Sequence, residues 1–264
     1  MTKKKIAALQ LCSQLDPQEN LIKISELLAQ AQALQVTHVF LPECFYSMSD
    51  GTMPSPFLID GENEHYHAIK NLAREFKVYL LGGSAATLHE GLVVNRNFNF
   101  SPTGVDLGFY DKMHLFSCEI EKAGNKKIIN EADIYTPGIA PKMITSEEFK
   151  IGMSICFDLR YPNIYRDYVL QGANLLSVSS AFTVPTGQAH WHTLLRARAI
   201  ENQCFVVAAA QWGRHNDKIQ TYGHSLIIDP WGTVLADGGA GEKLITAEID
   251  LEQIQKIRKS VKVF

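Results

Sequence analysis

The chain has 264 residues, of which 46% are hydrophobic and 20% are charged, and its formal net charge is −3. These values are ordinary for a globular chain of one large domain or two small ones, and they exclude the strongly basic surface that binds nucleic acid. The sequence also predicts no membrane span and no signal peptide at its start.

The cysteines are odd in number, widely spaced and without a CxxC pair. They are Cys12, Cys44, Cys118, Cys156 and Cys204. This pattern argues against a disulfide framework or a structural zinc site. It favours a reducing compartment, so we expect a cytoplasmic protein.

The chain as far as Asp111 predicts alternating strands and helices followed by a hairpin. The expected strands cover residues 6–11, 36–41, 78–81, 95–100 and 105–110. Apolar residues recur at helical spacing in 21–34 and 66–76, so each segment is expected to bury one face of a helix. Ser101-Pro102-Thr103-Gly104 has the composition of a turn, which makes the last two strands a hairpin.

The second half resumes this alternation after a long irregular segment. Residues 116–140 show little periodicity, and a loop of this length in a compact domain is usually functional or mobile. The expected strands beyond it cover residues 149–155, 173–179, 205–210, 225–228, 233–236 and 243–249. Helices are expected at 162–170, 188–202 and 251–259. Turn residues at 229–232 predict a second hairpin, which argues against a purely parallel sheet. The sequence therefore predicts one α/β domain over 1–264, layered as a sandwich with mixed sheets.

One cysteine lies where a buried strand is expected to end. Cys156 follows the apolar run 149–155 and precedes a polar segment that leads to Pro162. A side chain at such a strand-to-helix corner stands clear of the sheet, as the nucleophile of an elbow does. The position predicts a thiolate nucleophile; the alternative is a buried cysteine that closes a core strand.

A cysteine nucleophile needs a base for its proton, and it needs cations or hydrogen-bond donors for the developing oxyanion. Glu43 follows the strand that ends before Pro42, and Lys112 follows the second strand of the first hairpin. Both positions suit catalytic groups of a layered α/β protein. Taken singly, each residue is equally well explained as a solvated surface charge.

Three phrases in this order are similar to those of the nitrilase (carbon–nitrogen hydrolase) superfamily. They are Leu-Pro-Glu at 41–43, Tyr-Asp-Lys-Met-His-Leu-Phe at 110–116 and Ile-Cys-Phe-Asp-Leu-Arg-Tyr-Pro at 155–162. The similarity continues at 189–191, 196–202, 222–225 and 229–232. It implies an α-β-β-α sandwich, pairing into a homodimer across the helical face, and hydrolysis of an amide C–N bond without metal or cofactor.

The resemblance also implies a role for individual residues. Cys156 corresponds to the nucleophile, Glu43 to the general base and Lys112 to the cation beside the oxyanion. The backbone N–H of Phe157 would complete the oxyanion hole. Glu131 is our candidate for a second glutamate that the family often has in the loop between Lys and Cys. The same loop contains Glu119 and Glu121.

The chain departs from the family pattern at Phe157, where Tyr is common, and at Asn163, where Glu is common. Neither change removes a catalytic group. From the proximity of a thiol and a lysine we expect a lowered pKa for Cys156.

The substrate is suggested by the last third of the chain. Residues 203–211, followed by Gly213-Arg214-His215, resemble the deaminated-glutathione amidase branch most. The ω-amidases that act on α-ketoglutaramate are the alternative, along with other amidases and carbamoylases of the superfamily. Arg198, Arg214 and His215 could bind substrate carboxylates; otherwise Arg198 forms a helix-surface salt bridge and the other two are solvated loop residues.

Other classes of protein fit the sequence less well. A metal hydrolase could use His190 and His192 with His114 or His224, but imidazoles two residues apart on a helix point to different sides. A papain-like enzyme would carry its cysteine early in the mature chain, in other surrounding phrases. A non-catalytic interaction module would not need Glu43, Lys112 and Cys156 together.

Overall fold

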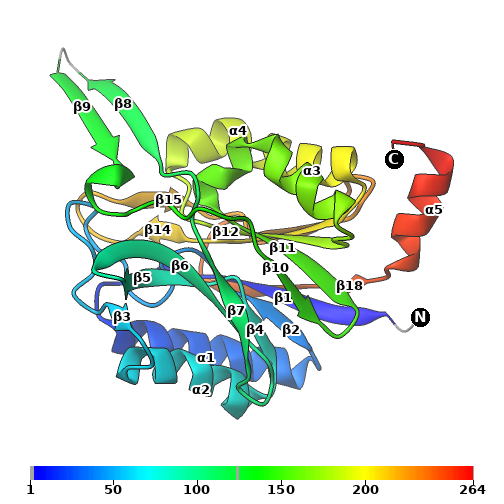
Figure 1. The fold of residues 1–264 in the computed structure, drawn as a ribbon, viewed down its shortest axis with the longest axis horizontal. Coiled ribbons are helices and arrows are strands. Elements are labelled where there is room, and N and C mark those ends of the chain that lie inside the picture. Colours follow the sequence, from blue (N-terminus) through cyan, green and yellow to red (C-terminus); the bar gives the residue numbers. More distant parts are fainter. Residues whose placement is uncertain (1–2, 123–124, 264) are drawn as a thin grey trace.

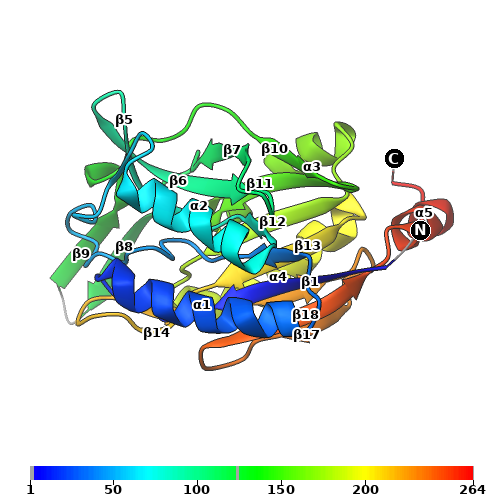
Figure 2. The ribbon, with the colours of Figure 1, turned by 90° about the horizontal axis from the view of Figure 1, so that it is seen from below.

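The computed structural model describes residues 3–122 and 125–263, the side chains of 119–129 excepted. Two sheets lie face to face between two layers of helices (Figures 1 and 2). Helices α1 (Pro17–Ala33) and α2 (Glu64–Phe76) cover one sheet, and α3 (Pro162–Leu170) and α4 (Val184–Asn202) cover the other. Helix α5 (Glu252–Ser260) lies at one end of the sandwich. The expected α-β-β-α fold is confirmed.

The first sheet has the strand order β18-β1-β2-β4-β6-β5-β3, with β7 paired to β6. Its strands are β1 (Lys4–Gln10), β2 (His38–Phe40), β3 (Ile59–Asp60), β4 (Tyr79–Leu81), β5 (Ser84–His89), β6 (Leu92–Phe100), β7 (Asp106–Asp111) and β18 (Lys243–Ile249). Strand β1 is parallel to β2 and antiparallel to β18, so the sheet is mixed, as predicted. The hairpin of β6 and β7 turns at residues 101–105, where the sequence predicts it.

The second sheet has the strand order β10-β11-β12-β13-β16-β17. Its strands are β10 (Met143–Ser146), β11 (Phe149–Ile155), β12 (Leu175–Ser180), β13 (Phe205–Ala210), β16 (Leu226–Ile228) and β17 (Val234–Asp237). Strands β11, β12 and β13 are parallel, and their residues are buried almost without exception because helices cover one face and the first sheet the other.

Strand β1 shows how the two cores form. Successive side chains of a strand point to opposite faces. Ile6 and Ala8 belong to the core between the sheets, whereas Ala7 and Leu9 pack in the core under α1 and α2. All four are fully buried, so a strand that reads as a continuous apolar run serves two cores.

The segment 116–140 differs from its expected loop. Residues of β8 (Ser117–Lys122) pair antiparallel with those of β9 (Asn125–Asn130), and a short 3₁₀ helix, η1 (Glu131–Asp133), follows. This hairpin projects from the body of the sandwich (Figure 1). The prediction was wrong because residues 117–122 and 125–130 are mostly polar, so the sequence lacks the sustained apolar alternation that marks a half-buried strand. The short strands β3, β5, β10, β14 (Trp212–Arg214) and β15 (Gln220–Tyr222) were not predicted either.

Within the described residues, no helix has both the length and the apolar character that crossing a bilayer requires.

Candidate active site

The ends of strands from both sheets carry the residues singled out in the sequence. Glu43 follows β2 after two residues, Lys112 directly follows β7, and Cys156 directly follows β11. Glu131 begins η1, at the base of the β8–β9 hairpin. Glu43 and Cys156 are more than 100 positions apart in the sequence, and the fold brings them together with Lys112 and Glu131.

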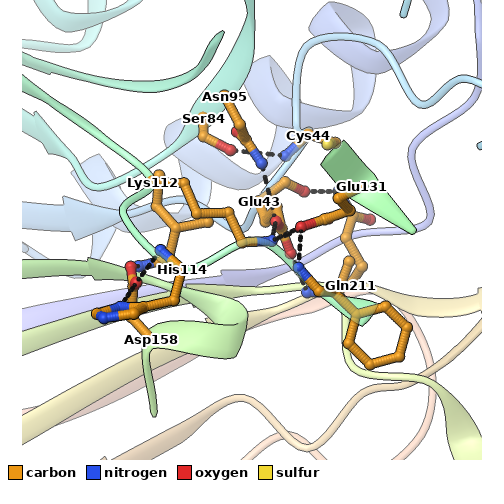
Figure 3. Close-up of polar contacts among 12 residues, drawn as sticks. Glu43, Cys44, Ser84, Asn95, Lys112, His114, Glu131, Asp158 and Gln211 are labelled. Carbon is orange, nitrogen blue, oxygen red and sulfur yellow. Dashed lines mark hydrogen bonds and ion pairs between the residues drawn. The ribbon is translucent and has the colours of Figure 1, made fainter. Parts of the chain in front are cut away.

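Lys112 lies between two carboxylates (Figure 3). Its Nζ is 2.9 Å from Oε1 of Glu43, and 2.9 and 2.7 Å from the two carboxylate oxygens of Glu131. The side chain of Lys112 is fully buried and that of Glu43 is 3% exposed, whereas that of Glu131 is 22% exposed. One buried cation with two anions satisfies the rule that buried charges are paired. The position of Glu131 is also fixed by the N–H of Phe116, which donates to its Oε2 over 2.7 Å.

The carboxylate of Glu43 is oriented by groups from three other segments. Its Oε1 accepts a hydrogen bond from Nδ2 of Asn95 on β6, and its Oε2 accepts one from the N–H of Ala181, just after β12, each over 2.9 Å. Its backbone carbonyl accepts a hydrogen bond from Gln211 Nε2 over 3.0 Å, a contact that Figure 3 shows. With these partners and Lys112, Glu43 has little rotational freedom.

Cys156 occupies a strained turn between β11 and α3. Its φ of +50° lies in the left-handed region that residues other than glycine seldom adopt. Such conformations persist only where the surroundings impose them, and they gather at functional sites. The short 3₁₀ helix η2 (Cys156–Arg160) then leads to Pro162, the first residue of α3. The expected strand-to-helix corner is present, and the thiol is 8% exposed at it.

Asp158 ties this turn to the segment around Lys112. Its Oδ2 accepts hydrogen bonds from the N–H of Ile155 and the hydroxyl of Tyr110, both over 2.8 Å. Its Oδ1 accepts one from the N–H of His114 over 3.0 Å and lies 2.7 Å from Nδ1 of the same residue. The carboxylate is fully buried, so these contacts are its only compensation for lost hydration among the described residues.

Burial and charge shift the three central ionisable groups. Burial raises the pKa of Glu43, and the nearby charge of Lys112 opposes that rise without cancelling it. Burial by itself would lower the pKa of Lys112, but the charges of Glu131 and Glu43 outweigh it and hold that pKa well above the ordinary value. Burial, reinforced by the charge of Glu43, raises the pKa of Cys156.

This result corrects the expectation of a lowered pKa for Cys156. Lys112 does favour the thiolate, but burial and the Glu43 carboxylate outweigh it. The sulfur at rest is therefore a neutral thiol, and a side-chain hydrogen bond with Cys156 acts to lower the pKa of Glu43. The arrangement suits transfer of the thiol proton to Glu43 as the sulfur reacts.

The three proposed carboxylate-binding residues all bind other groups of the protein. The guanidinium of Arg198 donates to the Leu159 carbonyl over 2.7 and 3.2 Å and to Glu201 over 2.8 Å, so it holds η2 against α4. His215 uses one ring nitrogen on the carbonyl of Ser13 and the other on Thr221, and burial lowers its pKa. A neutral His215 offers no charge to a carboxylate. Only Arg214 has an exposed guanidinium, with 68% of its side chain accessible.

Asn95, Asp158 and Ala181 were missed by sequence reasoning. A signal for Asn95 exists, because Asn95, Asn97 and Asn99 alternate along one strand, where they point to the same face, and all three are buried. Asp158 stands two residues after Cys156 in the matched phrase. No signal marks Ala181, since it acts through its backbone N–H. The alternatives Glu119 and Glu121 have side chains outside the described part of the chain.

The described residues bring together one group of three metal-ligating side chains, His192, His224 and Asp237. It lies at the surface and includes none of the residues around Cys156. Of the other histidines weighed as metal ligands, His114 contacts Asp158 and His190 lies 3.4 Å from Arg160.

Comparisons with known proteins agree with this geometry. The family model described as carbon–nitrogen hydrolase matches residues 5–259. A deaminated glutathione amidase of Dictyostelium discoideum is 36% identical, over 99% of this chain and 92% of its own length. The solved NitFhit protein of C. elegans superposes with a TM-score of 0.86 at 35% identity, covering 99% of this chain and 64% of that one. The solved Nit3 of Saccharomyces cerevisiae, a member of branch 10 of the nitrilase superfamily, gives 0.86 at 29% identity, covering 99% and 95%. The chain therefore belongs to the carbon–nitrogen hydrolase family and is an amidohydrolase of the nitrilase superfamily.

Proposed function

We propose that this amidase hydrolyses deaminated glutathione to α-ketoglutarate and cysteinylglycine through a thioester on Cys156. The observation that carries the catalytic assignment is the position of Lys112 Nζ within 2.9 Å of both Glu43 and Glu131, next to a strained turn that presents a thiol. The substrate is proposed from the relatives named deaminated glutathione amidase, which include a bovine protein at 37% identity over 98% of this chain.

In the first half-reaction, the thiol proton of Cys156 passes to Glu43 while Sγ attacks the amide carbonyl carbon. The negative charge that develops on the carbonyl oxygen is met by the ammonium of Lys112 and the backbone N–H of Phe157. The C–N bond then breaks, and Glu43 gives its proton to the leaving amine of cysteinylglycine. The α-ketoglutaryl group remains on Cys156 as a thioester.

In the second half-reaction, Glu43 takes a proton from water as the water oxygen attacks the thioester carbonyl. The C–S bond breaks, the thiolate regains its proton, and α-ketoglutarate leaves. Throughout, Glu131 keeps Lys112 charged, because its carboxylate raises the pKa of Lys112. Each group returns to its starting state, so the cycle needs no further reactant.

The substrate assignment predicts an order of kcat/KM values on one enzyme preparation. Deaminated glutathione is expected to lead, α-ketoglutaramate to follow, and simple nitriles to show negligible turnover. A neutral nitrile lacks the carboxylates that a charged pocket can bind. If α-ketoglutaramate leads by about tenfold, which is about 1.4 kcal/mol of transition-state preference, an ω-amidase assignment replaces this one.

Arg214 is the proposed residue that attracts the substrate carboxylates. It comes three residues after Gln211, which contacts the Glu43 backbone, and three extended residues span about 10 Å. Its partner Asp217 is 96% exposed, and exposed ion pairs are weak enough to exchange for a substrate. Arg214→Gln is expected to raise KM for deaminated glutathione roughly tenfold with kcat nearly unchanged.

The matched control for Arg214 is Lys218→Gln, which removes another cation near the same hairpin. Lys218 pairs with Asp50, and both side chains are about half exposed. The KM of the Lys218→Gln variant for deaminated glutathione is expected to stay at the wild-type value. Equal KM changes in the two variants would point to general electrostatic attraction, and an unchanged KM in Arg214→Gln would remove this residue from the binding group.

We also propose that the chain is one domain, that it acts in a reducing compartment, and that two copies pair across the layer of α3 and α4. Free thiols at Cys12, Cys44, Cys156 and Cys204 support a reducing, cytoplasmic location. Large apolar side chains exposed on or beside the helical layer support the dimer. They are Leu170 at 67%, Ile200 at 47% and Trp231 at 61% exposure.

The dimer predicts a change of mass when a charge replaces a central apolar group. Trp231→Lys is expected to convert a dimer into a monomer, because an unpaired charge cannot be buried at such an interface. Light scattering after size exclusion measures the mass directly. Met53→Lys is the control, since Met53 is 69% exposed in the segment between β2 and β3, which belongs to neither helix. A monomeric wild-type protein at micromolar concentration would contradict the proposal.

A further inference from the structure

Three ligand-type side chains from separate segments meet on the surface of the second half of the sandwich. His192 lies on α4, His224 lies between β15 and β16, and Asp237 ends β17. Their side chains are 34%, 29% and 36% exposed. Nε2 of His192 is 3.1 Å from one oxygen of Asp237, and Nδ1 of His224 is 2.9 Å from the other. Neither the catalytic sequence phrases nor the proposed reaction uses any of them.

The spacing of these atoms is close to that of ligands around one ion. Zinc binds imidazole nitrogen and carboxylate oxygen at about 2.0–2.2 Å, so two ligands of a tetrahedral ion lie about 3.3 Å apart. Both histidine–aspartate distances, 2.9 and 3.1 Å, are near that value. All three ligand atoms lie within 4.8 Å of one another, and the two imidazole rings have centroids 5.0 Å apart.

The backbone holds His224 and Asp237 in place for this arrangement. His224 has a φ of +54°, its N–H donates to the Gly239 carbonyl over 3.1 Å, and its carbonyl accepts the indole N–H of Trp191 over 2.7 Å. Its ring stacks on Tyr222 at a centroid distance of 4.5 Å. Asp237 Oδ1 accepts the N–H of Gly239 over 2.8 Å. Preorganised ligands with such supporting contacts are what a metal site requires.

The chemistry of the donors also suits a cation. The two carboxylate oxygens of Asp237 face the imidazole rings of His192 and His224. Zinc and similar transition metals bind imidazole nitrogen together with carboxylate oxygen, whereas magnesium and calcium take oxygen ligands.

We propose that His192, His224 and Asp237 form a binding site for a divalent transition-metal cation such as Zn²⁺, apart from the amide-hydrolysing site. Three protein ligands leave a fourth position for water, and the partial exposure of the cluster gives a hydrated ion access. A bound ion would fasten α4 to β17, two elements that the sequence separates. The inference does not depend on the proposed substrate.

The test titrates Zn²⁺ into chelator-treated, desalted full-length protein by calorimetry, with Co²⁺ absorption as a second probe of coordination. We expect one ion per chain and a rise in Tm of several degrees at saturating Zn²⁺. His192→Gln and Asp237→Asn are each expected to weaken binding at least about tenfold. Both residues are partly exposed, so either variant should fold.

Two controls separate this site from other sources of binding. His190→Gln alters a histidine on the same helix that lies outside the cluster, and its affinity for Zn²⁺ is expected to equal that of the wild type. Cys156→Ala removes the reactive thiol and is also expected to bind Zn²⁺ normally. The proposal would be overturned if the wild type bound no Zn²⁺. It would also be overturned if His190→Gln and His192→Gln lost Zn²⁺ affinity equally, or if only Cys156→Ala lost it. The cluster would then be a hydrogen-bonded Asp–His group.

Discussion

Replacing Cys156 with alanine is expected to abolish amide hydrolysis, by ~10⁴-fold or more in kcat, while the protein stays folded. The change removes one sulfur atom from a side chain that is 8% exposed, and alanine meets the same φ of +50° as cysteine does. Cys156→Ser is expected to be nearly as inactive, because a hydroxyl is a poor nucleophile at its own pKa. Steady-state kinetics and circular dichroism together check the prediction.

Cys44→Ala provides the matched control for the nucleophile. Cys44 adjoins Glu43, and like Cys156 it has a positive φ and a pKa raised by burial, but it does not lie at the corner that follows β11. The variant is expected to keep most of its activity. With a slow substrate, mass spectrometry is expected to find the acyl group on the peptide containing Cys156. An adduct on Cys44 or Cys118 instead would refute the assignment.

The second large effect on kcat is expected when Glu43 or Lys112 is replaced. Glu43→Gln keeps the shape of the side chain but removes the base, and Lys112→Met removes the cation; each is expected to lower kcat by at least ~10²-fold. Lys112→Met also leaves two carboxylates near each other without their cation, so its Tm is expected to fall as well. Single-turnover kinetics on folded protein measures the loss of catalysis separately from the loss of stability.

Three measurements complete this test. Lys70→Met removes a lysine that is 4.0 Å from Glu62 on the surface, and its kcat is expected to be unchanged. EDTA is expected to leave kcat unchanged. The raised pKa of Glu43 predicts that activity is lost as the pH falls through that value, because the protonated carboxyl cannot accept the thiol proton. Near wild-type kcat in Glu43→Gln or Lys112→Met would exclude this mechanism.

The sequence by itself determined the features that depend on neighbouring residues. The strand now seen at Lys243–Ile249 has its predicted bounds, and the turn at 101–104 fixed the hairpin that delivers Lys112. Turn chemistry and apolar periodicity are local properties, so they can be read without the fold. The corner at Cys156 was predicted for the same reason, since an apolar run followed by Pro162 marks a strand that leads into a helix.

Tertiary structure alone decided the properties that depend on distance and burial. The raised pKa of Cys156 follows from burial beside Glu43, which sequence spacing cannot give. For Arg198 the sequence left open a substrate carboxylate or a salt bridge on the helix surface as its partner, and the fold places the Leu159 carbonyl and Glu201 within hydrogen-bonding distance of its guanidinium. The cluster of His192, His224 and Asp237 exists only because α4 packs against the strands that follow it. Electrostatic energies depend on separation and on exposure to water, and both are set when distant segments pack.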